Sequence, residues 1–154
     1  MRIILVTALL TLVAATPAAQ VVGYGVAGPA TTMGFVDHSR ISFNVAGGAD
    51  VFFARHIAIG GEGGFFNRLS TASANASLHA GDGRSRVRPF VTAGYSRLGL
   101  GDGDGAFSGF NAGGGVNAWI GDRAGVRFEL RDHVRPDDRG LTHYWAARLG
   151  IVFK

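Results

Sequence analysis

Apolar and polar residues alternate along much of this chain. Between Ala72 and Ala80, alanine or leucine occupies every second position, and serine, asparagine or histidine occupies the positions between them. The same alternation recurs over 39–53, 125–134 and 142–153. Because successive side chains of a β-strand point to opposite faces, the pattern predicts strands with one apolar and one polar face. No convincing helical stripe follows the N-terminal segment.

Eight strands are predicted when the less regular segments are added. They lie near 21–28, 39–53, 56–66, 72–80, 87–99, 107–120, 124–134 and 142–153. The predicted connections alternate in length. Tight turns are expected at 54–55 and 121–123, an intermediate turn at 81–86, and mostly longer loops at 29–38, 67–71, 100–106 and 135–141. Such alternation is typical of membrane-spanning barrels. The sequence therefore predicts an all-β domain over 20–154, an eight-stranded antiparallel up-and-down transmembrane β-barrel.

Residues 1–19 have the pattern of a secretion signal. Arg2 is followed by an uncharged apolar run and then by small residues. The run is shorter than the ~20 residues that a membrane-spanning helix needs, and Pro17 would interrupt a helix retained as an anchor. We therefore expect a cleavable signal peptide, cut after Ala18 or Ala19.

Composition narrows the class of protein further. The chain has 154 residues, no cysteine, 25 glycines and a formal net charge of +4. A small exported domain without cysteine has no disulfides to compensate for a thin core, and a closed barrel in lipid is one way to be stable without them. The arginines are scattered, which argues against a nucleic-acid partner. The glycines follow no collagen period and lie among apolar residues, which argues against disorder.

The alternation alone also fits a soluble sandwich with its apolar faces inward. Charged residues on the polar faces favour the opposite arrangement, in which they fill a barrel interior. The expected interior charge network consists of Asp50, Glu62, Arg127, Glu129, Arg131 and Arg148. An eight-stranded barrel is just wide enough inside for side chains to fill it. One register of the last two predicted strands places Glu129 directly opposite Arg148.

Aromatic residues on the apolar faces support the same arrangement. If the N-terminus lies on the periplasmic side, the up-and-down path brings these aromatics to two levels. Phe43, Phe65, Tyr95, Phe110 and Trp145 then face outward near one rim, and Phe53 and Phe153 face outward near the other. Aromatic girdles flanking an apolar band are expected at the two lipid interfaces. Trp119 is an exception, because its position in the alternation points it inward.

Four stretches carry a family resemblance, namely 88–95, 110–119, 125–133 and 143–153. They resemble the small bacterial outer-membrane β-barrel domains, the OmpA-like and OmpW-like transmembrane barrels, better over 87–154 than over 21–86. The resemblance implies a Gram-negative cell envelope protein in the lipid bilayer of the outer membrane. In that family the barrel-assembly machinery reads a final strand with a terminal aromatic residue. Phe153 matches in kind, with Lys154 after it.

Motifs that suggest cofactor or metal binding lack the context they need. Gly23–Gly28 has the spacing of a dinucleotide-binding loop, but Pro29 and no helical stripe follow it. Asp102 and Asp104 lie in a Gly/Asp run that supplies only two carboxylates for calcium and reads as a turn. No metal-site spacing occurs among the histidines His38, His56, His79, His133 and His143. We expect no cofactor and no metal.

Four functions remain open. The leading interpretation is a structural or surface barrel with a polar, largely filled lumen and no catalytic residue. A narrow pore or conduit for small molecules is the second, because 113–115 is all glycine and leaves room inside. A lipid-modifying enzyme is the third, with His79 beside Ser77 or His133 beside Glu129 as candidates. Adhesion through the loops is the fourth, although short loops offer little surface.

Overall fold

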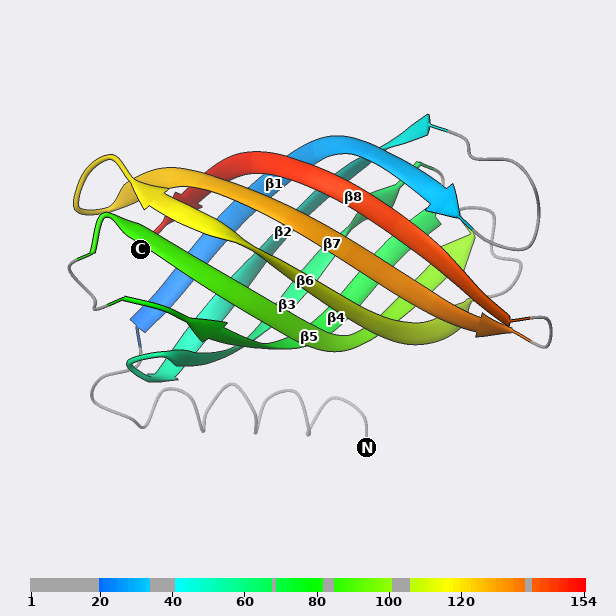
Figure 1. The fold of residues 1–154 in the computed structure, drawn as a ribbon, viewed down its shortest axis with the longest axis horizontal. Coiled ribbons are helices and arrows are strands. Elements are labelled where there is room, and N and C mark those ends of the chain that lie inside the picture. Colours follow the sequence, from blue (N-terminus) through cyan, green and yellow to red (C-terminus); the bar gives the residue numbers. More distant parts are fainter. Residues whose placement is uncertain (1–19, 34–40, 68, 82–84, 101–105, 138–139) are drawn as a thin grey trace.

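The computed structural model describes residues 20–33, 41–67, 69–81, 85–100, 106–137 and 140–154. It contains eight strands. They are β1 (Gln20–Met33), β2 (Ile41–Ala54), β3 (Ile57–Phe66), β4 (Leu69–His79), β5 (Val87–Leu100), β6 (Phe107–Trp119), β7 (Ala124–Asp137) and β8 (Gly140–Phe153). Each strand pairs antiparallel with the next, and β1 pairs with β8 to close the ring (Figure 1). The predicted closed, eight-stranded, antiparallel barrel is confirmed.

Closure of the ring removes the free edges of the sheet. A flat sheet would leave a row of unpaired N–H and C=O groups on β1 and another on β8. Here Gly23 pairs with Phe153 and Met33 pairs with His143, so the two terminal strands form one more antiparallel ladder. The ladder between β7 and β8 places Glu129 directly opposite Arg148, which confirms the predicted register.

The apolar faces point outward, away from the barrel axis. On β4, the outward residues Ala72, Ala74 and Ala76 are exposed, and the inward residues Asn75 and Ser77 are buried. Large apolar side chains of the other strands are also more than one-third exposed on the outer wall, although several strands turn apolar residues inward as well, among them Val22 and Val26 of β1. This arrangement is the opposite of a soluble sandwich.

The strands extend further toward one end than the alternation predicted. β1 continues to Met33 with Pro29 inside it, and β4 begins at Leu69. β7 and β8 together leave only 138–139 between them. The predicted loops at 67–71 and 135–141 are therefore wrong, because most of these residues belong to strands. Polar residues there continue the ladder, because backbone hydrogen bonds do not require an apolar face.

The N-terminal segment 1–19, where a signal peptide is expected, lies outside the described residues. Among the described residues, no helix is long and apolar enough to cross a membrane.

Candidate functional site

The interior of the barrel is the candidate site, because it holds most of the buried charge. The six predicted network residues all point inward and are at most 6% exposed. Asp50 comes from β2, Glu62 from β3 and Arg148 from β8, while Arg127, Glu129 and Arg131 are alternate residues of β7. Every second side chain of a strand points to the same face, so β7 alone supplies three residues to the interior.

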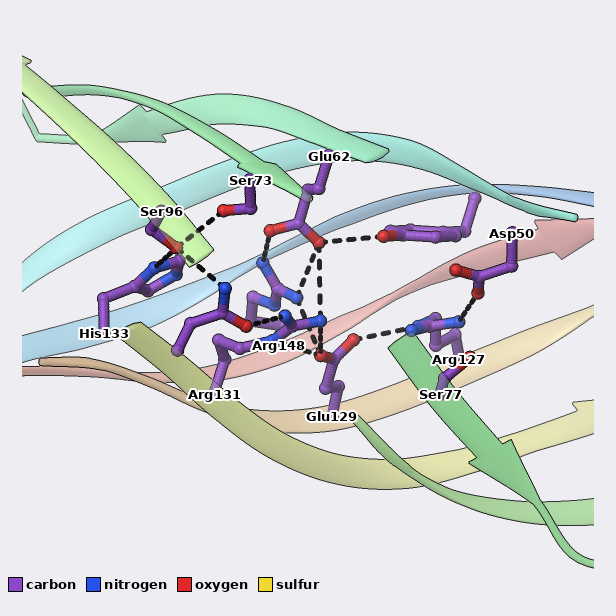
Figure 2. A network of polar contacts seen from close by, with 12 residues as sticks. Asp50, Glu62, Ser73, Ser77, Ser96, Arg127, Glu129, Arg131, His133 and Arg148 are labelled. Carbon is purple, nitrogen blue, oxygen red and sulfur yellow. Dashed lines mark hydrogen bonds and ion pairs between the residues drawn. The ribbon is translucent and has the colours of Figure 1, made fainter. Parts of the chain in front are cut away.

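Glu129 lies at the centre of the network (Figure 2). Its Oε2 accepts a hydrogen bond from Arg127 Nε at 2.9 Å, and its Oε1 accepts one from Arg131 Nε at 2.7 Å. Arg148 Nη2 forms a further ion pair with Oε1 at 2.9 Å. One fully buried carboxylate thus receives three guanidinium groups, and such burial is tolerable only with close partners.

Glu62 supplies a second negative charge to Arg148 and Arg131, because Glu129 alone does not neutralise the three arginines around it. Arg148 Nη1 and Nη2 donate to Glu62 Oε1 and Oε2 at 2.7 and 2.9 Å, the two-pronged geometry that suits an arginine and a carboxylate. Arg131 Nη2 lies 3.8 Å from Glu62 Oε2. The Tyr24 hydroxyl donates to the same oxygen at 3.1 Å. Tyr24 was not predicted, because the glycine-rich start of β1 shows no clear alternation.

Arg127 extends the network toward the end of the barrel where the chain terminates. Its Nη1 lies 3.5 Å from Asp50 Oδ2. Its guanidinium is held between the rings of Tyr24 and Phe90, with the carbon Cζ 4.0 and 4.1 Å from the two ring centres. Stacking on both faces stabilises a cation that has little contact with water.

A second polar cluster lies beside the network (Figure 2). Ser96 Oγ is 2.9 Å from His133 Nδ1 and 2.8 Å from Ser73 Oγ, and Asn111 Nδ2 donates to it at 2.8 Å. Asn111 Oδ1 in turn accepts from Arg131 Nη1 at 2.6 Å. His133, named as a candidate beside Glu129, thus has the hydroxyl of Ser96 as its hydrogen-bond partner.

Ser77 and His79, the other candidate catalytic pair, do contact each other. Ser77 Oγ lies 3.0 Å from His79 Nε2. The His79 ring packs against Phe52 and stacks on Phe90, and it is 3% exposed. Ser96 is fully buried, so the serines nearest to the two histidines are both enclosed. A nucleophile needs access to its substrate, and neither serine has it.

Apolar clusters lie on both sides of the charged layer. The cluster toward the end where β1 begins and β8 ends consists of Val22, Tyr24, Val26, Ala46, Phe52, Ala58, Trp119 and Val152. The cluster toward the opposite end consists of Ala30, Phe66, Leu98, Tyr144 and Ala146, with Leu69 and Phe107 packed against it. Along the axis, the interior therefore changes from apolar to charged and back to apolar.

The glycines of β6 do not leave an open space. A β-carbon at Gly113 would stand 3.1 Å from Arg131 Nε, and one at Gly115 would stand 2.9 Å from Phe90 Cζ. The room inside these glycines is filled by the side chains of Arg131 and Phe90. The glycine run 113–115, which suggested a pore, thus makes room for these two side chains.

The predicted interface aromatics all lie on the outer wall. Phe43, Phe65, Tyr95, Phe110, Trp145, Phe53 and Phe153 are between 43% and 63% exposed. Tyr95 and Phe110 are directly opposite each other on β5 and β6 and contact edge to face. Trp119 points inward, as its position in the alternation indicated, and is 8% exposed.

The other sequence motifs lie partly in β1 and partly outside the described residues. Gly23–Gly28 lies within β1, where no helix follows that could bind a dinucleotide phosphate. Asp102, Asp104 and His38 lie outside the described residues. In the part of the chain that the structure describes, no three histidine or acidic side chains gather to hold a metal ion.

Comparison with solved structures identifies the fold. Neisserial surface protein A superimposes with a TM-score of 0.72 at 15% identity, covering 89% of this chain and 99% of that one. The N-terminal β-barrel domain of Pseudomonas aeruginosa OprF gives 0.64 at 18% identity, with 88% and 98% covered. This chain has the fold of the small eight-stranded outer-membrane β-barrels. P. aeruginosa OprG, an outer membrane protein, gives 0.68 at 10% identity, with 88% and 95% covered.

The likeness is confined to the fold, because the sequences are only 10–18% identical. No protein-family model and no curated protein sequence matches the chain. The predicted resemblance to small outer-membrane barrels is confirmed at the level of architecture.

Proposed function

We propose that this chain is a bacterial outer-membrane β-barrel with a structural or surface role and a lumen closed by its own side chains. The observation that carries the proposal is the filled interior. Three arginines and three carboxylates pair across the lumen, with an apolar cluster on each side. Side chains that pair across the lumen stand in the way of a solute, and the candidate serines Ser77 and Ser96 are buried.

The outer wall supports a place in the lipid bilayer. Large apolar side chains are exposed on it, among them Val45, Ile59, Val91, Leu130 and Leu149. A soluble monomer rarely exposes an apolar surface of this extent. Every strand is paired on both sides, so no ladder edge would meet lipid unsatisfied. The aromatics at the two ends of the wall suit the interfaces on either side of a hydrocarbon layer.

The two ends of the sequence support export and assembly into the outer membrane. The segment 1–19 would direct the chain across the inner membrane and be cut after Ala18 or Ala19. The last strand carries outward residues at alternate positions, ending at Phe153, which is 53% exposed. We propose that the barrel-assembly machinery reads this strand and its terminal aromatic residue.

Refolding of the mature chain in detergent tests the membrane barrel. A closed barrel should stay folded in an unboiled gel lane, migrate differently after boiling, and show mainly β-structure by circular dichroism. It should also resist extraction from liposomes by alkaline carbonate. A chain that is folded and soluble without detergent would contradict the proposal.

A narrow pore is the second candidate. OprG and OprF show that outer-membrane proteins share the fold, but that likeness carries no function. The glycines of β6, which suggested room for a solute, are packed against Arg131 and Phe90. The interior thus favours the closed form, and ion conductance separates the two.

A further inference from the structure

Four basic side chains gather at the end of the barrel where β1 begins and β8 ends. Arg55, Arg86, Arg123 and Lys154 are all exposed in or beside the turns at this end. Among the described residues of these turns, Asp122 is an exposed acid. None of the four cations forms an ion pair with any residue in the described ranges. No described acid therefore neutralises them as an ion-pair partner.

A cavity of about 330 Å³ lies within this basic rim, defined as Arg55, Arg86, Arg123 and Lys154. Arg86 and Lys154 line it, together with Trp119 and Asp122. Two backbone hydrogen bonds hold its walls, from Trp119 N to Arg86 O at 2.7 Å and from Lys154 N to Arg123 O at 3.0 Å. Lys154 Nζ lies 4.5 Å from the centre of the Trp119 ring. The ammonium is thus held beside the cavity by a cation–π contact.

One exposed apolar side chain lines the cavity, and two more lie on the outer wall at the same end of the barrel. Ile120 lines the cavity and is 80% exposed. Val87 and Phe153 begin β5 and end β8, and they are 56% and 53% exposed on the outer face of the wall. A soluble anion would use only the charges of this region. An amphiphile with an anionic head and apolar chains would use the charges and the apolar side chains together.

We propose that the basic rim and its cavity bind the phosphate of an anionic phospholipid in the adjoining leaflet. The phosphate would lie between Arg86 and Lys154, and the acyl chains would lie along Ile120, Val87 and Phe153. The Asp122 carboxylate opposes such binding, so the balance of charge in the cavity sets the affinity. This proposal rests on the proposed membrane location, because the lipid must surround the wall.

Native mass spectrometry of the folded barrel with phosphatidylglycerol or phosphatidylcholine tests the proposal. Wild type should retain phosphatidylglycerol in preference. A basic side chain near an anionic lipid surface contributes about 1 kcal/mol, so Arg86→Gln and Lys154→Gln should each weaken retention roughly fivefold. Asp122→Asn should strengthen it. Arg97→Gln removes the same charge from an exposed position near the other end of the wall and is the matched control.

Failure of the lipid site and failure of the proposed membrane location give different results in this experiment. A chain that fails to fold in detergent contradicts the membrane location. A folded barrel that retains both lipids equally, or loses retention as much with Arg97→Gln, overturns the lipid site. Displacement of phosphatidylglycerol by an equal concentration of inorganic phosphate also overturns it, since the ligand would then be a soluble anion.

Discussion

Arg148 on β8 reaches across the barrel to Glu62 on β3, where two hydrogen bonds of 2.7 and 2.9 Å join guanidinium and carboxylate. β3 and β8 are not neighbours in the wall. The contact therefore spans the lumen instead of running along it, and Figure 2 shows Glu129 and Arg131 beside it. Side chains that meet in this way occupy the space through which a solute would pass.

Removal of the Glu62 charge should destabilise the barrel. Glu62→Gln leaves Arg148 and Arg131 with one carboxylate fewer in a buried layer, and breaking a buried pair costs about 3–5 kcal/mol. Urea unfolding in detergent, followed by tryptophan fluorescence, measures the loss. Asp122→Asn makes the same chemical change at an exposed turn and should alter the free energy of unfolding by less than about 0.5 kcal/mol. Equal effects of the two substitutions would mean that the interior pair adds nothing.

The crowded glycines of β6 should not tolerate a methyl group. In Gly115→Ala the new β-carbon would collide with the Phe128 carbonyl oxygen and stand 2.9 Å from Phe90 Cζ. Overpacking of this kind costs about 1–3 kcal/mol. Gly61→Ala on β3 is the control, because its β-carbon would meet nothing closer than 3.8 Å. The same unfolding assay should find Gly61→Ala neutral or stabilising, and a similar loss in both variants would contradict the packing described.

A charge on the middle of the outer wall should impair insertion. Ala74 is exposed at the centre of β4, and Ala74→Arg should be destabilising by about 2–4 kcal/mol if that position faces hydrocarbon. Ser70, also exposed on β4 but close to its end, should accept arginine at a cost of about 0–1 kcal/mol. Yield of folded protein in liposomes measures both. Equal yields would show that the wall does not face lipid.

The faces of the strands follow from sequence, but the partners inside the barrel do not. A period of two fixes which residues point inward, so Asp50, Glu62, Arg148 and the three residues of β7 were all identifiable. Pairing of neighbouring strands then places Glu129 opposite Arg148. Contacts across the lumen depend on strand stagger and on side-chain rotamers, which the alternation does not contain. Arg148 therefore meets Glu62 as well, through a contact that no local pattern indicates.

His133 shows why proximity in sequence misleads in a strand. His133 and Glu129 point the same way on β7, but four residues of extended chain separate them by ~13 Å. His133 instead meets Ser96 from β5, which lies two strands away in the wall. The ends of the strands were equally hard to place, because Pro29 and the polar residues after it continue β1 without any apolar alternation.

Ion conductance of the refolded wild-type barrel in a planar lipid bilayer tests the closed interior most directly. Gel mobility before and after boiling first establishes that the protein is folded, and a known porin in the same bilayer serves as the positive control. We predict no discrete conductance steps above the background of the bare bilayer, because paired charges and two apolar clusters fill the lumen. Reproducible conductance steps from the folded wild type would contradict a closed interior and establish a pore.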